Sequence, residues 1–196
     1  MDTPRTRKDL THDRILETAA RAIRRGGFHG VGVAGIMGEA GLTHGGFYAH
    51  FSSRNALLAE ALARAGQDSA ALIEQARAAG QARGASALRA LVEGYLSDRH
   101  LTAIEAGCPV AALASEMPRQ SPEVRAASAQ RVRGLVAAVR RALPKGAPAD
   151  GSRVIASQLV GALQLARALG DNAEGRALLK ASRRALLAQY DHTPSG

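Results

Sequence analysis

The chain of 196 residues contains one cysteine, no tryptophan, and only three phenylalanines and three tyrosines. Because Cys108 stands alone, no intrachain disulfide can form, and a reducing compartment is expected. No apolar run approaches the roughly 18 residues of a membrane-spanning helix, and the N-terminal stretch MDTPRTRKDLTHDR is polar and charged rather than an apolar signal segment. We therefore predict a soluble cytoplasmic protein without a membrane partner, long enough to bury a large core without cross-links.

β-branched residues are also sparse, and no stretch keeps the two-residue alternation of a strand. Alanine, leucine and arginine dominate instead, which is typical of an all-α protein. Gly41 is the expected left-handed stop of the second helix. Thr43 is the expected cap of the third helix, and Ser52 or Ser53 that of the fourth. The helices expected in this part run from after Thr11 to Gly26, from Gly32 to Ala40, through the segment GLTHGGFYAHF, and from about Arg54 towards Ile73.

Longer amphipathic segments follow from about residue 80. Ser121, Pro122 and Glu123 combine a capping hydroxyl, a proline at the first helical position and an acid in the first turn, which predicts a strong helix start. The prolines and glycine of residues 144–148 form the clearest breaker cluster in the chain. The helices expected here cover about 88–95, 122–143, 151–169 and 173–190, in an all-α chain of about nine helices.

Residue patterns that carry catalysis are lacking. There is no Ser/His/Asp arrangement and no His/Cys cluster with metal-ligand spacing, and the pairs Gly26-Gly27 and Gly45-Gly46 lack the spacing and the lysine of a Walker loop. We therefore expect neither enzyme activity nor a metal nor a cofactor. An activity that was lost on substitution of Cys108 would reverse this expectation.

The formal net charge of +9 favours an anionic partner, of which nucleic acid is the commonest. The charge is unevenly distributed, because residues 1–60 hold eight Lys and Arg against six Asp and Glu, whereas the remaining residues hold 18 against 11. Most of the excess therefore lies outside the first third of the chain. A nucleic-acid partner has to be argued from a motif rather than from net charge.

The first third of the chain has the layout of a helix-turn-helix, because three short helices fall within about 50 residues and AGLT joins the second to the third. In that motif one helix lies against the DNA backbone and the next enters the major groove. Gly45 and Gly46 each cost about 1 kcal/mol relative to alanine inside a helix. A helix that lies against bases and phosphates gains from lacking side chains on its outer surface, whereas a core helix gains nothing.

The segment GFHGVGVAGIMGEAGLTHGGFYAHFSSRNALLAEAL, Gly27 to Leu62, closely resembles the DNA-binding region of the tetracycline-repressor (TetR) family of bacterial regulators. Gly32 departs from the family pattern by replacing the usual hydroxyl residue at the start of the second helix, and Met37 replaces a small polar residue or alanine. The resemblance is specific because many positions match in a fixed order. These are Gly27-Phe28, Ile36, Ala40-Gly41, Thr43, Gly45, Phe47-Tyr48, His50-Phe51 and Arg54.

The resemblance implies roles for single residues of this segment. Phe47 and Phe51, four residues apart on one face, would pack inside the module, while Tyr48 is rotated by about 100° from Phe47. The alternatives are that all three aromatics are plain core and that His50 is an ordinary surface histidine. The implied DNA-binding residues are Thr43, Tyr48, His50 and Arg54 towards phosphates, with Thr43 also capping the recognition helix, and His44, Gly45, Gly46 and Ala49 towards base edges.

Direct reading of bases is expected to be thin, because only His44 offers a large polar tip. Methyl contacts, water and DNA shape would then supply specificity. Arg5, Arg7 and Lys8 form either a basic arm that contacts DNA or a solvated tail.

Resemblance to the family also implies a homodimer. One recognition helix reads too few bases to select a genomic site, whereas two related by a two-fold axis can grip a palindromic operator in double-stranded DNA. The last two helices are the expected contact, and Gly161, Ala162, Ala166 and Ala185 would permit close packing of a four-helix interface. The alternative is that these small residues face only the core of their own chain.

The same resemblance implies that the middle helices form a chamber for an unknown small-molecule effector. Cys108 precedes Pro109, and if Pro109 starts a helix, the thiol lies at an N-terminus that favours a reactive thiolate. The alternative is a buried, inert cysteine. The candidate ligand-binding residues are Tyr95, His100, Cys108, Met117 and Gln164.

Together these features predict a helix-turn-helix domain at residues 1–55 and a ligand-binding and dimerisation domain at residues 56–196. The function they favour is a TetR-like repressor, released from its operator by a small molecule or an electrophile through differential binding to two states. A second hypothesis is a helical binding or adaptor protein that keeps the fold without operator binding, and Gly32 is the residue in its favour.

Overall fold

The computed structural model describes residues 5–191, which contain helices and no strand. The prediction of an all-α protein is confirmed. Four elements come first: α1 (Arg7–Gly26), α2 (Val33–Glu39), the 3₁₀ helix η1 (His44–Ala49) and the long α3 (Arg54–Gln81). They are followed by α4 (Ala87–Tyr95), α5 (Asp98–Thr102), α6 (Pro109–Leu113), the 3₁₀ helix η2 (Met117–Arg119), α7 (Pro122–Ala142), α8 (Gly151–Leu169) and α9 (Ala173–Tyr190).

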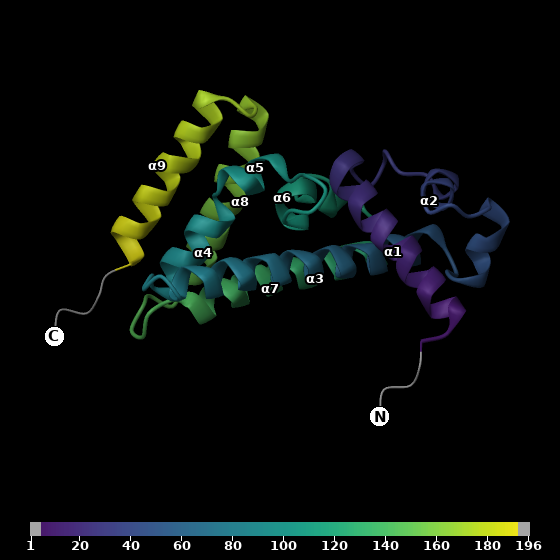
Figure 1. Ribbon diagram of the computed structural model, residues 1–196, viewed down its shortest axis with the longest axis horizontal. Helices are drawn as coiled ribbons and strands as arrows, with labels where there is room; N and C mark the ends of the chain where they lie inside the picture. The colour runs from purple at the N-terminus through teal and green to yellow at the C-terminus, as the bar shows by residue number, and fades with distance from the viewer. Residues whose placement is uncertain (1–4, 192–196) are drawn as a thin grey trace.

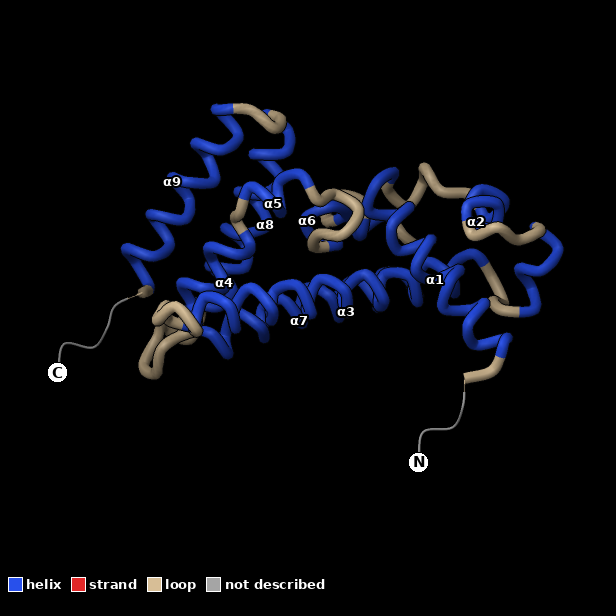
Figure 2. Tube along the Cα trace, in the orientation of Figure 1, coloured by secondary structure: helices blue, strands red, loops and turns tan. Residues whose placement is uncertain are grey.

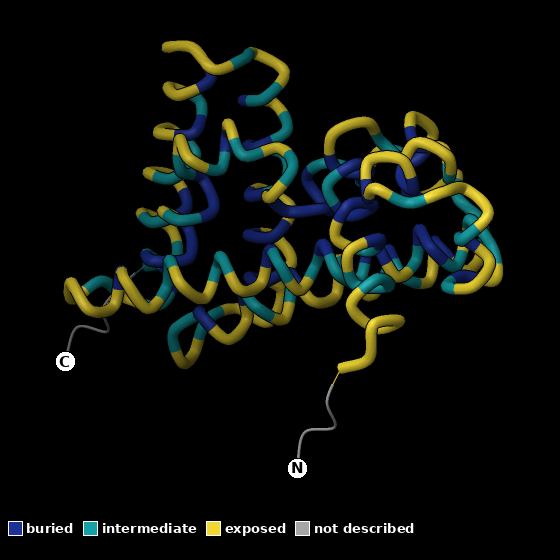
Figure 3. The backbone as a smooth tube through the Cα atoms, turned by 45° about the vertical axis from the view of Figure 1, so that its right-hand side comes forward, coloured by how far each residue is buried: buried dark blue, intermediate teal, exposed yellow. Residues whose placement is uncertain are grey.

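The elements are arranged along one axis. Figure 1 shows α3 and α7 along its length, α1, α2 and η1 at one end, and α8 with α9 at the other. Figure 2 shows that most of the chain is helical, with loops confined to short connections. In Figure 3 the buried backbone lies where these elements face one another, and the exposed positions lie on their outer sides. Within residues 5–191, no helix is long and apolar enough to cross a bilayer.

The start of α1 differs from the expected one. Thr6, rather than Thr11, caps the helix: its hydroxyl accepts a hydrogen bond from the Asp9 backbone N–H at 3.2 Å, and the Asp9 carboxylate accepts from the Thr6 N–H at 2.9 Å. This reciprocal capping box satisfies two backbone donors at once and therefore fixes the start in a polar stretch. The expectation was wrong because it was based on the apolar stripe, which begins only at Ile15.

The second and third elements carry glycines with different roles. Gly41 has φ 68° and ends the α2 turn in the left-handed region, as predicted. The helix that follows is 3₁₀ rather than α, and Thr43 stands at its N-cap position without a side-chain capping hydrogen bond. The predicted capping role of Thr43 is therefore wrong. Gly45 and Gly46 explain the weak helix, since glycine supports a regular α-helix poorly.

The long helix α3 begins as predicted, with the Ser53 hydroxyl accepting a hydrogen bond from the Ala56 N–H at 3.0 Å. It continues to Gln81, beyond the expected end near Ile73. Its first part packs against α1 and the rest against α4 and α7. Because α3 contributes to both ends of the molecule, the domain division after residue 55 remains a prediction.

The later helices follow the sequence pattern closely. Ser121 caps α7 through the Val124 N–H at 3.4 Å, and Pro122 occupies the first helical position. Helices α8 and α9 have the predicted bounds and pack against each other. Ala162 and Ala166 are buried in the core of the chain itself, so their predicted place on the dimer surface is wrong, whereas Ala185 is exposed and Gly161 half-buried.

Candidate nucleic-acid interface and ligand chamber

The segment around η1 is anchored by two phenylalanines. Phe47 and Phe51 are buried, and their rings stack with centroids 5.7 Å apart. This confirms that both pack inside the module. Tyr48 has the opposite environment, because it is 72% exposed, although its ring meets Phe47 edge to face with centroids 5.1 Å apart. A large aromatic that is left in solvent beside a packed one is available to a partner.

The remaining η1 residues present little side-chain bulk. Thr43, His44, Gly45 and Ala49 are exposed, and Gly46 is half-buried. A Cβ built on Gly45 would meet no atom within 4 Å, and Gly45 is not among the glycines with positive φ. Neither packing within the chain nor backbone conformation therefore requires glycine at this position, although glycine destabilises a helix relative to alanine.

His50 is less exposed than Tyr48 and Ala49, the two residues before it. It is half-buried, and its Nδ1 is inaccessible and lacks a hydrogen-bond partner within the described residues. Burial, then the charges of His12 and Lys8, lower the pKa of His50. His12 stacks on Phe51 at 4.6 Å, and its Nε2 lies 3.1 Å from the Glu60 carboxylate. At neutral pH the His50 ring is therefore uncharged, and it can offer a hydrogen bond rather than a charge to a phosphate.

Arg54 contacts the protein itself. Its Nε and Nη2 donate to the Val31 carbonyl at 3.4 and 3.1 Å, and Nη2 also donates to the Phe28 carbonyl. These bonds fasten the α1–α2 turn to the first residue of α3. This positioning role was missed because it joins residues 23 and 26 positions apart, which no local pattern reveals. The predicted phosphate contact of Arg54 remains a prediction.

The basic run near the N-terminus is not a separate arm over the residues described. Arg5 forms an ion pair with Asp13 at 2.5 Å, and Arg7 and Lys8 belong to the first turn of α1, where both are exposed. The start of α1 lies at the same end of the molecule as η1 (Figure 1). A phosphate contact from α1 is compatible with this position.

Polar contacts join the end of α1 to the segment Glu105–Glu116. The Phe28 N–H donates to the Glu116 carboxylate at 2.9 Å, and Arg25 forms an ion pair with Glu105 at 3.0 Å. Arg24, which is 4% exposed, donates to the Gly107 carbonyl at 3.4 Å and to Asp68 at 3.4 Å. These acceptors offset part of the free-energy cost of burying a charged guanidinium.

Two cavities lie beside α3. The larger, of about 640 Å³, is lined by α3, α6, α7 and Leu91 of α4. The smaller, of about 340 Å³, is lined by α3, α4 and the chain around α5. Ser69 and Ile73 line both, so α3 separates them. Cys108 lines the larger cavity, while Tyr95 and His100 line the smaller one. Met117 and Gln164 line neither, so the five residues predicted to share one ligand site are not brought together.

Cys108 and His100 are linked across the loop between α5 and α6. Pro109 starts α6 and Cys108 is its N-cap, as expected, and the cysteine is buried. Its backbone N–H donates to His100 Nε2 at 2.9 Å, so His100 Nδ1 carries the proton and donates to the Tyr95 carbonyl at 2.6 Å. A Cβ at Gly107 would lie 2.7 Å from that Nε2, so glycine is needed for this close approach. Burial lowers the pKa of His100 to about 4.

The Tyr95 hydroxyl is the least satisfied polar group in this region. It is inaccessible to solvent and has no hydrogen-bond partner of acceptable geometry within residues 5–191. Burial first, and then the neighbouring Cys108 sulfur, raise the pKa of Tyr95 well above its usual value. The ring meets His100 edge to face at 4.9 Å. Cys108, Tyr95 and His100 are thus neighbours in the core, although they face two different cavities.

Comparison with known proteins matches both ends of the chain. Residues 15–61 match bacterial regulatory proteins of the tetR family, and residues 84–182 match a tetracyclin repressor-like C-terminal domain. An HTH-type transcriptional regulator of Mycobacterium tuberculosis, itself uncharacterised, is 31% identical over 170 residues, which cover 81% of this chain and 85% of that protein.

Solved structures agree over nearly the whole length. The reduced form of NemR from E. coli has a TM-score of 0.75 at 20% identity, over 95% of this chain and 99% of that one. A TetR regulator from Chloroflexus aurantiacus has a TM-score of 0.73 at 19% identity, over 93% of this chain and 96% of that one. These two likenesses concern the fold. From the matched domains and the mycobacterial relative, the chain belongs to the tetR family of bacterial transcriptional regulators, with a helix-turn-helix DNA-binding domain.

Proposed function

We propose that this regulator is a repressor that binds a palindromic operator as a homodimer and leaves it when an effector occupies the larger cavity. The observation that carries the proposal is the pairing of exposed Tyr48 with Gly45 on an element anchored by buried Phe47 and Phe51. The aromatic is unused by the fold, and the glycine serves no purpose within the chain. Both are explained when the outer side of η1 lies against DNA.

The proposed contacts divide by chemistry. Tyr48, His50 and Thr43 offer hydrogen bonds to phosphates, which fix the module on the duplex. His44, Gly45, Gly46 and Ala49 face base edges, where His44 alone brings a polar tip. Arg7 and Lys8 on α1, both exposed, add charge near the backbone.

The outer faces of α8 and α9 support the proposed dimer. Val154, Leu165 and Leu169 on α8 are large apolar side chains exposed in the single chain, with Leu165 60% exposed. Gly161 on α8 is half-buried and Ala185 on α9 is exposed, and residues this small would let a partner helix approach closely. A second copy, related by a two-fold axis, would cover this surface and complete a four-helix interface.

Segment Glu105–Glu116 supports a route from the effector to the operator. Cys108, Pro109 and Val110 form part of the cavity wall, while Glu105, Gly107 and Glu116 hold the end of α1. An effector that displaces this wall changes the contacts that position α1 and η1. The effector can weaken operator binding by at most the difference between its binding free energies for the DNA-binding arrangement and for the displaced one. An electrophile that adds to Cys108 would act on the same segment.

A gel shift with the DNA upstream of the protein's own gene tests this function. We expect a sequence-specific shift at low salt, weakened at least tenfold by Tyr48→Ala and by His44→Ala, and unchanged by Leu10→Ala, an exposed residue of α1. The adaptor hypothesis predicts that no sequence-specific shift occurs and that these substitutions leave the protein's activity unchanged. In favour of that hypothesis, Gly32 caps α2 without a side-chain hydrogen bond, which removes one phosphate donor. Absence of a shift from the dimeric protein would decide for it.

A further inference from the structure

The larger cavity carries excess positive charge within an otherwise apolar lining. Its volume of about 640 Å³ is in the range of small-molecule sites. Its charged lining residues are Glu74, Arg77, Arg131 and Arg141, so the walls hold three guanidinium groups and a single carboxylate. Apart from Ser69 and Cys108, the other lining residues are glycine, alanine, proline and aliphatic side chains.

The carboxylate of Glu74 already has a partner. Arg77, three residues further along α3, donates to one Glu74 oxygen through Nε at 2.9 Å and to the other through Nη2, and its Nη1 donates to Gln81 at 2.8 Å. The hydrogen bond with Arg77 is the main cause that lowers the pKa of Glu74, and the charge of Arg141 contributes least. The Glu74–Arg77 pair is therefore neutral, which leaves two guanidinium groups uncompensated.

Arg131 is the more enclosed of these two. Like Arg141, it forms no ion pair with any residue between 5 and 191, and its Nε has neither solvent contact nor a hydrogen-bond partner there. Its side chain lies across α3 at Gly66, where an added Cβ would come within 2.5 Å of Arg131 Cδ and Nη1. The missing side chain at position 66 thus provides the room for this guanidinium.

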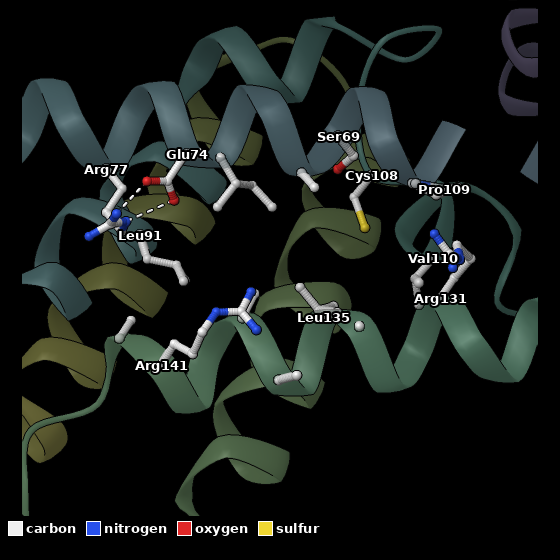
Figure 4. Close-up of a pocket in the computed structure, with 17 residues that line it drawn as sticks. Ser69, Glu74, Arg77, Leu91, Cys108, Pro109, Val110, Arg131, Leu135 and Arg141 are labelled. Carbon is white, nitrogen blue, oxygen red and sulfur yellow. Dashed lines mark hydrogen bonds and ion pairs between the residues drawn. The ribbon is translucent and has the colours of Figure 1, made fainter. Parts of the chain in front are cut away.

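The charged groups lie at different ends of the cavity. Figure 4 shows Arg131 beside Val110 at one end and the Glu74–Arg77 pair at the other, with the Cys108 sulfur directed between them. In Figure 4, Leu91 lies near the Glu74–Arg77 pair and Leu135 lies nearer Arg131. Ile73 also lines the cavity. A ligand that fits this arrangement has an apolar body and an anionic group at the end remote from Glu74.

We propose that the larger cavity binds an amphipathic organic carboxylate, with its carboxylate on Arg131 and its apolar body along Ile73, Leu91 and Leu135. A planar guanidinium matches a carboxylate in a bidentate geometry. At the other end, Arg77 is already bound to Glu74, and Arg141 is exposed to solvent, so a carboxylate gains less there than on the enclosed Arg131. Arg141, which is exposed and also lines the cavity, raises the concentration of anions near the cavity. The inference rests on the proposed function only in treating this cavity as the effector site.

Calorimetric titration of the full-length protein with decanoate and with decanamide tests the assignment, because the two have the same chain length and differ in charge. We expect decanoate to bind at least tenfold more tightly than decanamide. Arg131→Gln should remove that difference, Arg131→Lys should retain part of it, and Arg133→Gln, which changes an exposed arginine on α7 outside the cavity, should leave it unchanged.

Equal affinity for both compounds in the unsubstituted protein would overturn the proposal, and that comparison does not depend on any variant folding. Decanoate binding that survives Arg131→Gln would overturn it as well, because the anion would then lie elsewhere on this basic chain. The operator gel shift without ligand separates the two proposals. A normal shift with no preference for decanoate refutes the carboxylate alone, whereas a missing shift refutes the regulator.

Discussion

Replacing Gly45 with alanine should stabilise the protein and, at the same time, weaken its binding to the operator. A Cβ at this position meets nothing within 4 Å, and the backbone does not need positive φ. Alanine in a helix is favoured over glycine by about 0.5–1 kcal/mol. For a chain of 150–250 residues this raises the melting temperature by about 1–4 °C.

The same methyl group occupies the space that DNA would fill. If the η1 backbone lies against the duplex, each protomer brings one added methyl into the contact. We expect the operator dissociation constant to rise at least tenfold, equivalent to about 1.4 kcal/mol. Thermal unfolding followed by circular dichroism and a gel shift at fixed salt measure the two effects on the same sample.

Gly134→Ala is the matched control. Gly134 is an exposed glycine inside α7, and a Cβ there also meets nothing within 4 Å. This variant should gain similar stability and keep operator affinity in the absence of effector. Wild-type affinity in Gly45→Ala would refute the reasoning, since the glycine would then have no use in the DNA contact. A lower melting temperature would refute the stated geometry of η1.

The other predictions concern the route from the chamber, the histidine of the core and the dimer. Glu116→Ala leaves the partly buried Phe28 N–H without an acceptor, so the free energy of unfolding in urea should fall by about 1–3 kcal/mol, against less than about 1 kcal/mol for Glu123→Ala. Because the pKa of His100 is lowered to about 4 in the folded chain, its contribution is fully present above about pH 6.5 and is lost as the pH falls towards 4. Urea titrations at several pH values should show a loss of about 3 kcal/mol that His100→Gln removes; an unchanged pH slope would contradict the buried neutral ring. Leu165→Glu should give monomers in analytical ultracentrifugation and abolish the operator shift, while Val132→Glu on α7 should stay dimeric; a dimeric Leu165→Glu would place the interface elsewhere.

Local sequence signals predicted the ends of helices that are fixed by interactions between neighbouring residues. Ser121 with Pro122, Gly41 and the breaker cluster at 144–148 act on neighbouring backbone groups, so they located α7, the end of α2 and the start of α8. The aromatic pattern likewise separated buried Phe47 and Phe51 from exposed Tyr48. In each case the deciding interaction spans only a few residues.

The remaining features depend on contacts between distant segments. Arg24, Arg54 and Glu116 bind groups 23 to 88 residues away, and no periodicity reports such a pair. The chamber was misjudged for the same reason. Its residues were predicted as one set, but α3 lies between the cavity that contains Cys108 and the cavity that contains Tyr95 and His100.

Because α3 is unbroken, a small tilt of this helix produces a large displacement at its far end. At a rise of about 1.5 Å per residue, its 28 residues form a rod of about 42 Å. If the Gln81 end is held and the rod tilts by about 5°, the end at Arg54 swings by about 3.7 Å, close to the rise of about 3.4 Å per base pair. A disturbance too small to alter the fold would thus move each module by one base step, enough to put two recognition elements out of register with successive grooves.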